Sequence, residues 1–192
     1  MNLSDLRKKR KILMLTAYDY QMAKILDETG IDMILVGDTL GMVVLGYPDT
    51  KSVTIDDMIH HTKAVARGAK STPIIGDMPI NTFNTVEAAL QNAKKILDAG
   101  AHGVKIEGNR PKIVESLLKE GIPVMGHVGL LPQSAERFRL QGKTAAAAER
   151  ILGDAVALDT LGVFAIVLEC IPESLAKKIT ETVNAPTIGI GA

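Results

Sequence analysis

Ionisable side chains recur at the ends of short apolar runs along this chain. Five consecutive runs each finish with one of them, and these are Asp38, Asp77, Glu107, His127 and Glu169. A helix cap explains any single acid in such a position, because acids are common just before helices. It does not explain the same placement five times in succession. We therefore predict that these side chains gather in one place.

Several carboxylates held side by side require a cation, because without one they repel each other and their pKa values rise. Mg²⁺ takes oxygen ligands, commonly one or two carboxylates together with waters and substrate oxygens. Asp38, Asp77 and Glu107 follow adjacent runs and can converge on such an ion. A 2-oxo acid can chelate Mg²⁺ through its keto and carboxylate oxygens, and the metal then polarises the carbonyl. A base could remove the acidified neighbouring proton to form an enolate.

The stretch GAHGVKIEGNR, residues 100–110, allows three interpretations of where its charged side chains lie. Successive side chains of a strand point to opposite faces, so Lys105 and Glu107 share a face. That face could meet solvent, carry a structural ion pair, or belong to a reaction site. The acids on neighbouring runs favour the site, where Lys105 would hold a substrate carboxylate or offset the acidic charge. His127 is either a packing residue or a substrate contact, and we leave it outside the catalytic set.

The elements that must position these residues alternate along the chain. Strand-like apolar runs are separated by segments with helical periodicity, which predicts a parallel sheet covered by helices. In such proteins the active site lies at the carboxyl ends of the strands. The pattern allows an open doubly wound sheet or a barrel, although an eight-stranded barrel typically needs about 250 residues. The predicted strands lie in residues 11–17, 32–38, 72–78, 102–108, 122–128, 163–170 and 185–192, and the clearest helices in residues 54–69, 85–100, 144–162 and 172–183.

Composition narrows the class of protein. The chain has 192 residues, and its 22 basic and 22 acidic side chains give no net charge. We therefore expect no binding to nucleic acid or to an anionic membrane surface. Cys170 is the only cysteine, which fits a reducing compartment. The chain has neither a secretory signal nor an apolar run of the roughly 18 residues that span a membrane. From these features we expect a soluble, cytoplasmic protein.

Motifs spread over nearly the whole chain occur in the order found in one known family. They are LTAYDY, LVGDTLGM, GYPDTKSVTIDDMIHHTKAV, DMPINTF, AGAHGVKIEG, GIPVMGHVGLLPQS, LECIPESLAKKIT and IGIGA. Through them the chain resembles the ketopantoate (3-methyl-2-oxobutanoate) hydroxymethyltransferase family. The resemblance implies a (β/α)₈ TIM barrel of the phosphoenolpyruvate/pyruvate type. It also implies dependence on Mg²⁺ and a homo-oligomer, usually a decamer of two pentamer rings.

The same resemblance assigns roles to individual residues. Asp38 and Asp77 match the direct metal ligands, and Glu107 matches the third acid of the metal site. Asp38, Asp77, Thr39 and Lys105 match the positions that contact the 2-oxo acid. Glu169 matches the proton acceptor. Thr39 stands where the family often has Ser, and it keeps the hydroxyl group.

The implied reaction is the first step of pantothenate biosynthesis. A hydroxymethyl group passes from 5,10-methylenetetrahydrofolate to 3-methyl-2-oxobutanoate and gives 2-dehydropantoate. The folate enters only through the resemblance. One alternative is another Mg²⁺-dependent 2-oxo acid lyase or aldolase on the same barrel, and a second is an inactive oligomerisation module. Family members continue beyond the final GIGA, so we expect residues 1–192 to form one barrel domain that lacks its C-terminal strand and helices.

Overall fold

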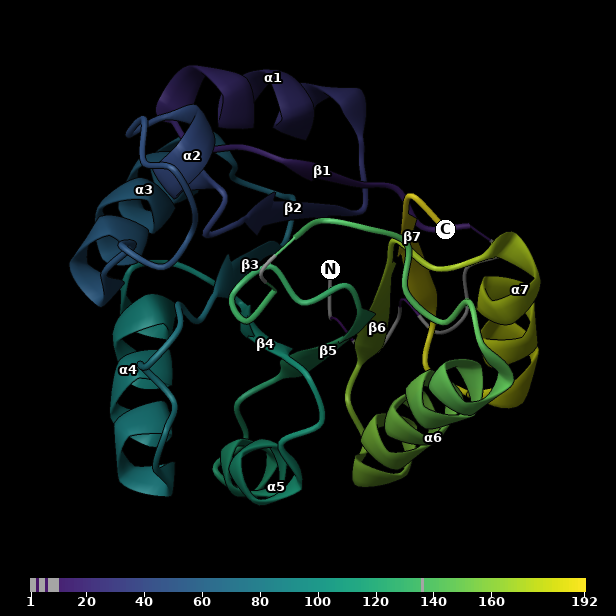
Figure 1. Ribbon diagram of the computed structural model, residues 1–192. Helices are drawn as coiled ribbons and strands as arrows, with labels where there is room; N and C mark the ends of the chain where they lie inside the picture. Colours follow the sequence, from purple (N-terminus) through teal and green to yellow (C-terminus); the bar gives the residue numbers. More distant parts are fainter. Residues whose placement is uncertain (1–2, 4–5, 7–10, 136) are drawn as a thin grey trace.

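The strands form one parallel sheet whose order follows the chain. The computed structural model describes residues 3, 6, 11–135 and 137–192. Within them, seven strands pair in the order β1-β2-β3-β4-β5-β6-β7, as Figure 1 shows. The strands are β1 (Met14–Thr16), β2 (Met33–Val36), β3 (Ile74–Asp77), β4 (Gly103–Glu107), β5 (Val124–Gly129), β6 (Ala165–Glu169) and β7 (Thr187–Ile190).

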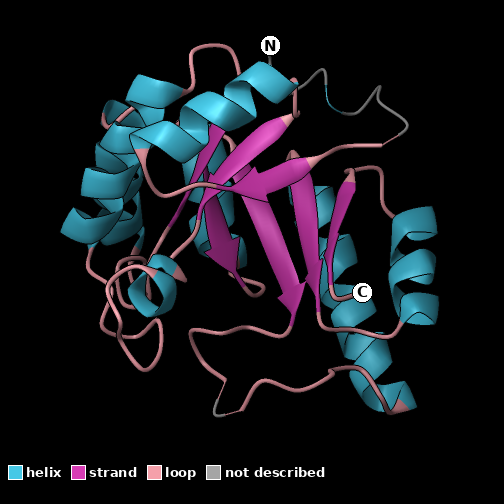
Figure 2. Cartoon of the chain, turned by 90° about the horizontal axis from the view of Figure 1, so that it is seen from above, coloured by secondary structure: helices cyan, strands magenta, loops and turns pink. Residues whose placement is uncertain are grey.

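The helices lie around the outside of the curved sheet (Figures 1 and 2). A doubly wound sheet reverses its strand order at one point and carries helices on both faces. Here the order never reverses, so the sheet is singly wound, and the prediction of a barrel is confirmed over that of an open sheet. The helices are α1 (Tyr20–Thr29), α2 (Leu40–Val43), α3 (Ile55–Gly68), α4 (Val86–Asp98), α5 (Pro111–Lys119), α6 (Ala145–Leu161) and α7 (Glu173–Thr182).

Local chemistry fixes where the principal helices begin. The four predicted helical segments match α3, α4, α6 and α7 to within two residues at each end. The hydroxyl oxygens of Thr54, Thr85 and Thr144 each accept a backbone N–H from the first turn of the helix that follows. Thr54 and Asp57 complete a reciprocal capping box. The carboxylate of Asp19 caps α1 in the same way, by accepting from the N–H of Met22. No helix in the described part of the chain is long and apolar enough to cross a membrane.

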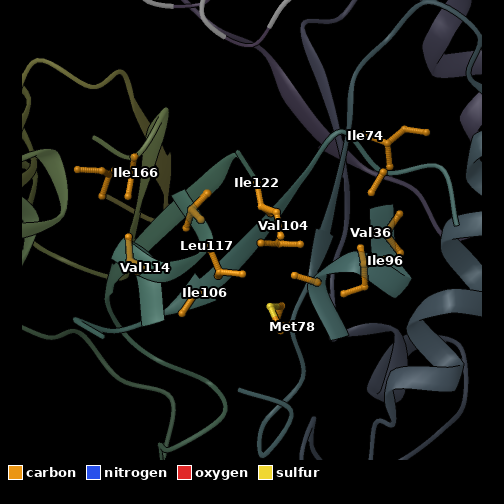
Figure 3. Close-up of a cluster of buried hydrophobic side chains, with 14 of the residues drawn as sticks. Val36, Ile74, Met78, Ile96, Val104, Ile106, Val114, Leu117, Ile122 and Ile166 are labelled. Carbon is orange, nitrogen blue, oxygen red and sulfur yellow. The ribbon is translucent and has the colours of Figure 1, made fainter. Parts of the chain in front are cut away.

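Alternation along the strands separates two apolar layers. Side chains that point outward pack against the helices, and Figure 3 shows part of this layer around Val104 and Ile106. Side chains that point inward form a second cluster, which includes Leu35, Ile75 and Met125. Side chains two residues apart on a strand point to the same face. Asp77 therefore points inward as Ile75 does, and His127 points inward as Met125 does. The polar residues at the strand ends therefore lie on top of the inner apolar layer.

Gly68, the last residue of α3, allows α1 and α3 to pack closely. A Cβ atom at this position would clash with the backbone oxygen of Tyr20 and would lie 2.9 Å from the Cβ of Ala23. The neighbouring atoms are mostly backbone and cannot rotate away. The contact between α1 and α3 therefore depends on the absence of a side chain at residue 68.

We predict that Gly68→Ala destabilises the protein by about 1–3 kcal/mol, the usual effect of overpacking a close contact. Urea denaturation followed by circular dichroism measures this change. Gly153→Ala is the matched control, because Gly153 lies inside α6 with no atom within 4 Å of its added Cβ. That substitution should stabilise the protein by about 0.5–1 kcal/mol, since alanine favours the helix. Equal effects of the two substitutions would contradict this packing argument.

Candidate active site

The strand register brings the inward-pointing polar residues together at one end of the sheet. Asp77 of β3 is the register partner of Lys105 on β4. Glu107, two residues further along β4, is the partner of His127 on β5. Gly129, two residues beyond His127, is the partner of Glu169 on β6. The register of β3 to β6 thus places Asp77, Lys105, Glu107, His127 and Glu169 near the carboxyl ends of these strands, where barrel enzymes carry their active sites.

Lys105 supplies the buried positive charge of this cluster. Its Nζ lies 2.7 Å from Oδ1 of Asp77, and both side chains are at most 5% exposed. Burial alone would lower the pKa of Lys105, but the charges of Asp77, Glu107 and Asp38 outweigh burial and raise it. Lys105 is therefore a permanent cation. Its direct partner is Asp77 rather than Glu107.

Asp38 follows β2 and lies against Asp77. The backbone N–H of Asp38 donates to Oδ2 of Asp77 over 3.1 Å. Burial raises the pKa of Asp38 to about 7, and the charge of Asp77 adds to the effect. The next residue, Thr39, bonds through its hydroxyl to the hydroxyl of Tyr18 at 2.7 Å. Burial also raises the pKa of Tyr18, and Asp77 and Asp38 contribute to that rise.

Glu107 is buried two residues beyond Lys105 on β4. Its Oε2 accepts the backbone N–H of Gln133 at 3.1 Å. Burial raises the pKa of Glu107 to about 8 and outweighs the attraction of Lys105. Three buried carboxylates, those of Asp38, Asp77 and Glu107, thus surround a single ammonium group.

His127 links this buried layer to Glu169. Its Nδ1 lies 3.4 Å from Nζ of Lys105, and its Nε2 lies 3.1 Å from Oε2 of Glu169. Burial and the charge of Lys105 lower the pKa of His127, so the ring is neutral near pH 7. An ammonium group can only donate, so Nδ1 must accept and the ring proton resides on Nε2. That proton faces Glu169, without the alignment of a full hydrogen bond.

Glu169 is the most exposed acid of the cluster. Its side chain is 18% exposed, whereas that of His127 is 1% exposed. The backbone of β5 approaches it closely, because a Cβ on Gly129 would clash with the carbonyl oxygen of Glu169. That carbonyl accepts the N–H of Leu130 at 2.8 Å. Gly129 has a φ of +98°, a conformation that favours glycine, and from there the chain leaves β5 beside Glu169.

A carboxylate excess of this kind suits a hard cation. Asp38 and Asp77 provide adjacent oxygen donors, and Mg²⁺ needs only one or two carboxylates when water and substrate supply the rest. Among the described residues, no group of three or more acidic, imidazole or thiol side chains is arranged to hold a metal ion by itself. Carboxylate oxygens are the donors that Mg²⁺ takes, so the chemistry of Asp38 and Asp77 fits such an ion.

Comparison with known proteins identifies the family. The family model described as ketopantoate hydroxymethyltransferase matches residues 1–192. The chain belongs to the ketopantoate hydroxymethyltransferase family. It is 53% identical to the 3-methyl-2-oxobutanoate hydroxymethyltransferase of Syntrophus aciditrophicus, over 97% of this chain and 71% of that protein. It is 56% identical to the enzyme of the same name from Clostridium kluyveri, over 95% of this chain and 68% of that protein.

Solved structures of proteins with other names share the fold of this ketopantoate hydroxymethyltransferase family member. Phosphonopyruvate hydrolase superposes with a TM-score of 0.76 at 15% identity, over 99% of this chain and 72% of that chain. A 2,3-dimethylmalate lyase of the PEP mutase/isocitrate lyase superfamily gives a TM-score of 0.72 at 16% identity, over 98% of this chain and 71% of that chain. These likenesses establish the barrel.

The structure brings together every residue that the sequence and the resemblance placed in the site of this ketopantoate hydroxymethyltransferase family member. It also adds residues that sequence reasoning did not include. His127, which was left outside the catalytic set, contacts both Lys105 and Glu169. Tyr18 and Gln133 lie in the matched motifs LTAYDY and GLLPQS, but nothing in their spacing indicated a contact with the acids. The motifs could have marked these two residues as candidates.

We predict that the metal-free protein loses stability as the pH rises from about 5 to about 8, and that the loss levels off above about pH 8. The folded-state pKa values of Asp38 and Glu107 are raised to about 7 and about 8, whereas both groups ionise near pH 4 in an unfolded chain. Between these values the folded state holds protons that the unfolded state has already lost, so stability falls with rising pH until the folded state loses them too. Differential scanning fluorimetry in EDTA should show a thermal midpoint that decreases over this window.

Asp38→Asn provides the control for this pH dependence. The amide has no proton to release, so the slope of the thermal midpoint against pH should become shallower. His127 opposes this effect below about pH 6.5, because its pKa is lowered in the folded state and the unfolded chain binds that proton more readily. The wild type and Asp38→Asn share His127, so equal slopes of the thermal midpoint in the two proteins would contradict the raised pKa of Asp38.

Proposed function

We propose that this protein transfers a hydroxymethyl group from 5,10-methylenetetrahydrofolate to 3-methyl-2-oxobutanoate and so forms 2-dehydropantoate. The relatives that carry the name 3-methyl-2-oxobutanoate hydroxymethyltransferase support the reaction. The observation that carries the proposal is the convergence of Asp38, Asp77, Lys105 and Glu169 at one end of the barrel, in a member of this family. The product is a precursor of pantothenate.

In this proposal, Asp38 and Asp77 hold Mg²⁺ directly, and Glu107 serves as the third acid of the metal site. When bound, the ion supplies Lewis-acid polarisation of the substrate carbonyl and offsets the carboxylate charge. Lys105 stays charged and provides attraction for the carboxylate of the 2-oxo acid. The hydroxyl of Thr39, held by Tyr18 at 2.7 Å, provides a further polar contact for that substrate.

Glu169 acts as the general base in this proposal. It removes the proton from the carbon next to the ketone, and that carbon then attacks the methylene carbon carried by the folate. The bond between the methylene carbon and the folate nitrogen breaks, water supplies the hydroxyl group, and tetrahydrofolate is released. Two features support the role: Glu169 is more accessible than the other acids, and the Nε2–H of His127 faces its carboxylate. A cavity of about 650 Å³ begins at Gly129, the register partner of Glu169, and gives room for a second substrate. Arg137 and Arg139 line this cavity.

We infer the assembly and the location from the family alone. The protein would be a homo-oligomer, a decamer of two pentamer rings, that works in the cytoplasm as a single barrel domain. Sedimentation velocity of the purified protein tests the assembly. A monomer at micromolar concentration would contradict it.

We predict that the protein exchanges the C3 proton of 3-methyl-2-oxobutanoate with D₂O in the presence of Mg²⁺ and without folate. Glu169→Gln should slow this exchange by about 10²–10⁴-fold, the usual contribution of a positioned base. Rigorous metal removal with EDTA should suppress the exchange in the wild-type protein, and added Mg²⁺ should restore it. Proton NMR of the substrate measures the rate.

Glu173→Gln is the matched control for the exchange experiment. Glu173 lies four residues further along the chain, in the exposed first turn of α7. Its substitution should leave the exchange rate unchanged. Undiminished exchange in Glu169→Gln would remove Glu169 as the base, and full exchange after metal removal would remove the role of Mg²⁺. A folate-dependent assay that yields no 2-dehydropantoate would instead favour another reaction of 2-oxo acids.

A further inference from the structure

Gln133 occupies an unusual position for a residue in a loop. It lies in the segment between β5 and α6, outside any regular element, yet its exposed fraction is only 4%. Long polar side chains are seldom buried unless they are fully paired. The partners of Gln133 therefore indicate why this loop folds inward over the strand ends.

The side-chain amide of Gln133 joins two strands. Its Nε2 donates to Oδ2 of Asp38 and to the carbonyl oxygen of Met78, each over 2.9 Å. A carboxylate and a carbonyl can only accept, so the nitrogen end of the amide must be the end that faces them. Both of its N–H groups are thus used, one beyond the end of β2 and one beyond the end of β3. The hydrogen bond to an ionised Asp38 is charge-assisted and the stronger kind.

The backbone of the same residue reaches a third strand. The N–H of Gln133 donates to Oε2 of Glu107 at the end of β4, over 3.1 Å. One residue therefore contacts two of the carboxylates assigned to the metal site, that of Asp38 after β2 and that of Glu107 on β4. Within the described part of this loop, only Gln133 donates a hydrogen bond to Asp38 or Glu107.

We propose that Gln133 is a positioning residue of this site, which orients the Asp38 carboxylate for a divalent cation and fastens the loop after β5 to the acids. The inference rests on the proposed function, because it concerns the cation that Asp38 and Asp77 would hold. By occupying Oδ2 of Asp38, the amide directs the other oxygen toward the cation. Hydrogen bonds that orient metal ligands typically change metal affinity by about 10–100-fold.

Two substitutions separate the contribution of the Gln133 amide to metal binding from the contribution of its side-chain volume. Methionine matches glutamine in length and flexibility but cannot donate a hydrogen bond, so Gln133→Met keeps the packing and removes the orientation. Gln133→Ala removes both. If the amide is responsible, the two variants lose metal affinity to a similar degree. If packing is responsible, only the alanine variant does.

The experiment measures Mg²⁺ binding by isothermal titration calorimetry on the full chain, with metal alone and no substrate. We expect Gln133→Met and Gln133→Ala each to bind Mg²⁺ about 10–100-fold more weakly than the wild type. Gln141→Ala is the matched control and should bind as the wild type does, because Gln141 is another glutamine of this loop, and its side-chain amide donates to the carbonyl oxygen of Arg139 in the same loop. Circular dichroism establishes that each variant is folded.

Two results overturn the proposal: wild-type affinity in Gln133→Met, or weakened binding in Gln133→Ala alone. If Gln133→Met does not fold, Gln133→Asn takes its place under the same criteria, since its amide is one methylene too short to reach Asp38. Binding by the wild type with no change in the variants leaves the proposed function intact. A wild-type protein that does not bind Mg²⁺ contradicts the metal role in the proposed function and this inference with it.

Discussion

One ammonium group among several carboxylates is the interaction on which this site depends. Lys105 is 4% exposed and can neutralise only one of the three buried acids around it. Removing one partner from a buried ion pair typically costs about 3–5 kcal/mol, so Lys105 and Asp77 fix each other within the protein interior. Lys105 does not neutralise the carboxylates of Asp38 and Glu107, and their pKa values rise because burial disfavours their negative charge. In the proposed function, a bound divalent cation would offset this negative charge.

The geometry of the barrel produces this concentration of charge. Parallel strands in sequential order all end at the same rim, and alternation directs every second side chain inward. The inner apolar layer around Leu35, Ile75 and Met125 lies beneath the polar residues and keeps water away from that side of them. Hydrogen bonds and ion pairs are stronger in such surroundings than in water, and unpaired groups cost more there. The side-chain amide of Gln133 satisfies acceptors that the strands alone leave unpaired.

The same barrel accommodates different reactions in proteins of other names, so the fold alone does not indicate the chemistry. What distinguishes this chain is the set of residues on the rim. Two adjacent aspartates, a charged lysine and a more accessible glutamate next to a neutral histidine suit the activation of a 2-oxo acid. The residues that face the cavity after β5 would then select the partner substrate. Membership of the ketopantoate hydroxymethyltransferase family is consistent with each part of this arrangement.

The sequence by itself determined the alternation of strands and helices, the threonine caps of the main helices, and the acids at the strand ends. These features follow from local periodicity and from the chemistry of single residues, which a linear pattern records. The family motifs added the assignment of Asp38, Asp77, Lys105, Glu107 and Glu169. The strand and helix pattern allowed a barrel or an open sheet, and the resemblance implied the barrel. The tertiary structure decided the matter, because strand order is a long-range property. It alone paired Lys105 with Asp77 rather than with Glu107, and it alone brought His127, Tyr18 and Gln133 to the acids. Gln133 lies 95 residues from Asp38 in the chain, and a contact over that separation depends on how the loop packs, which no local pattern specifies.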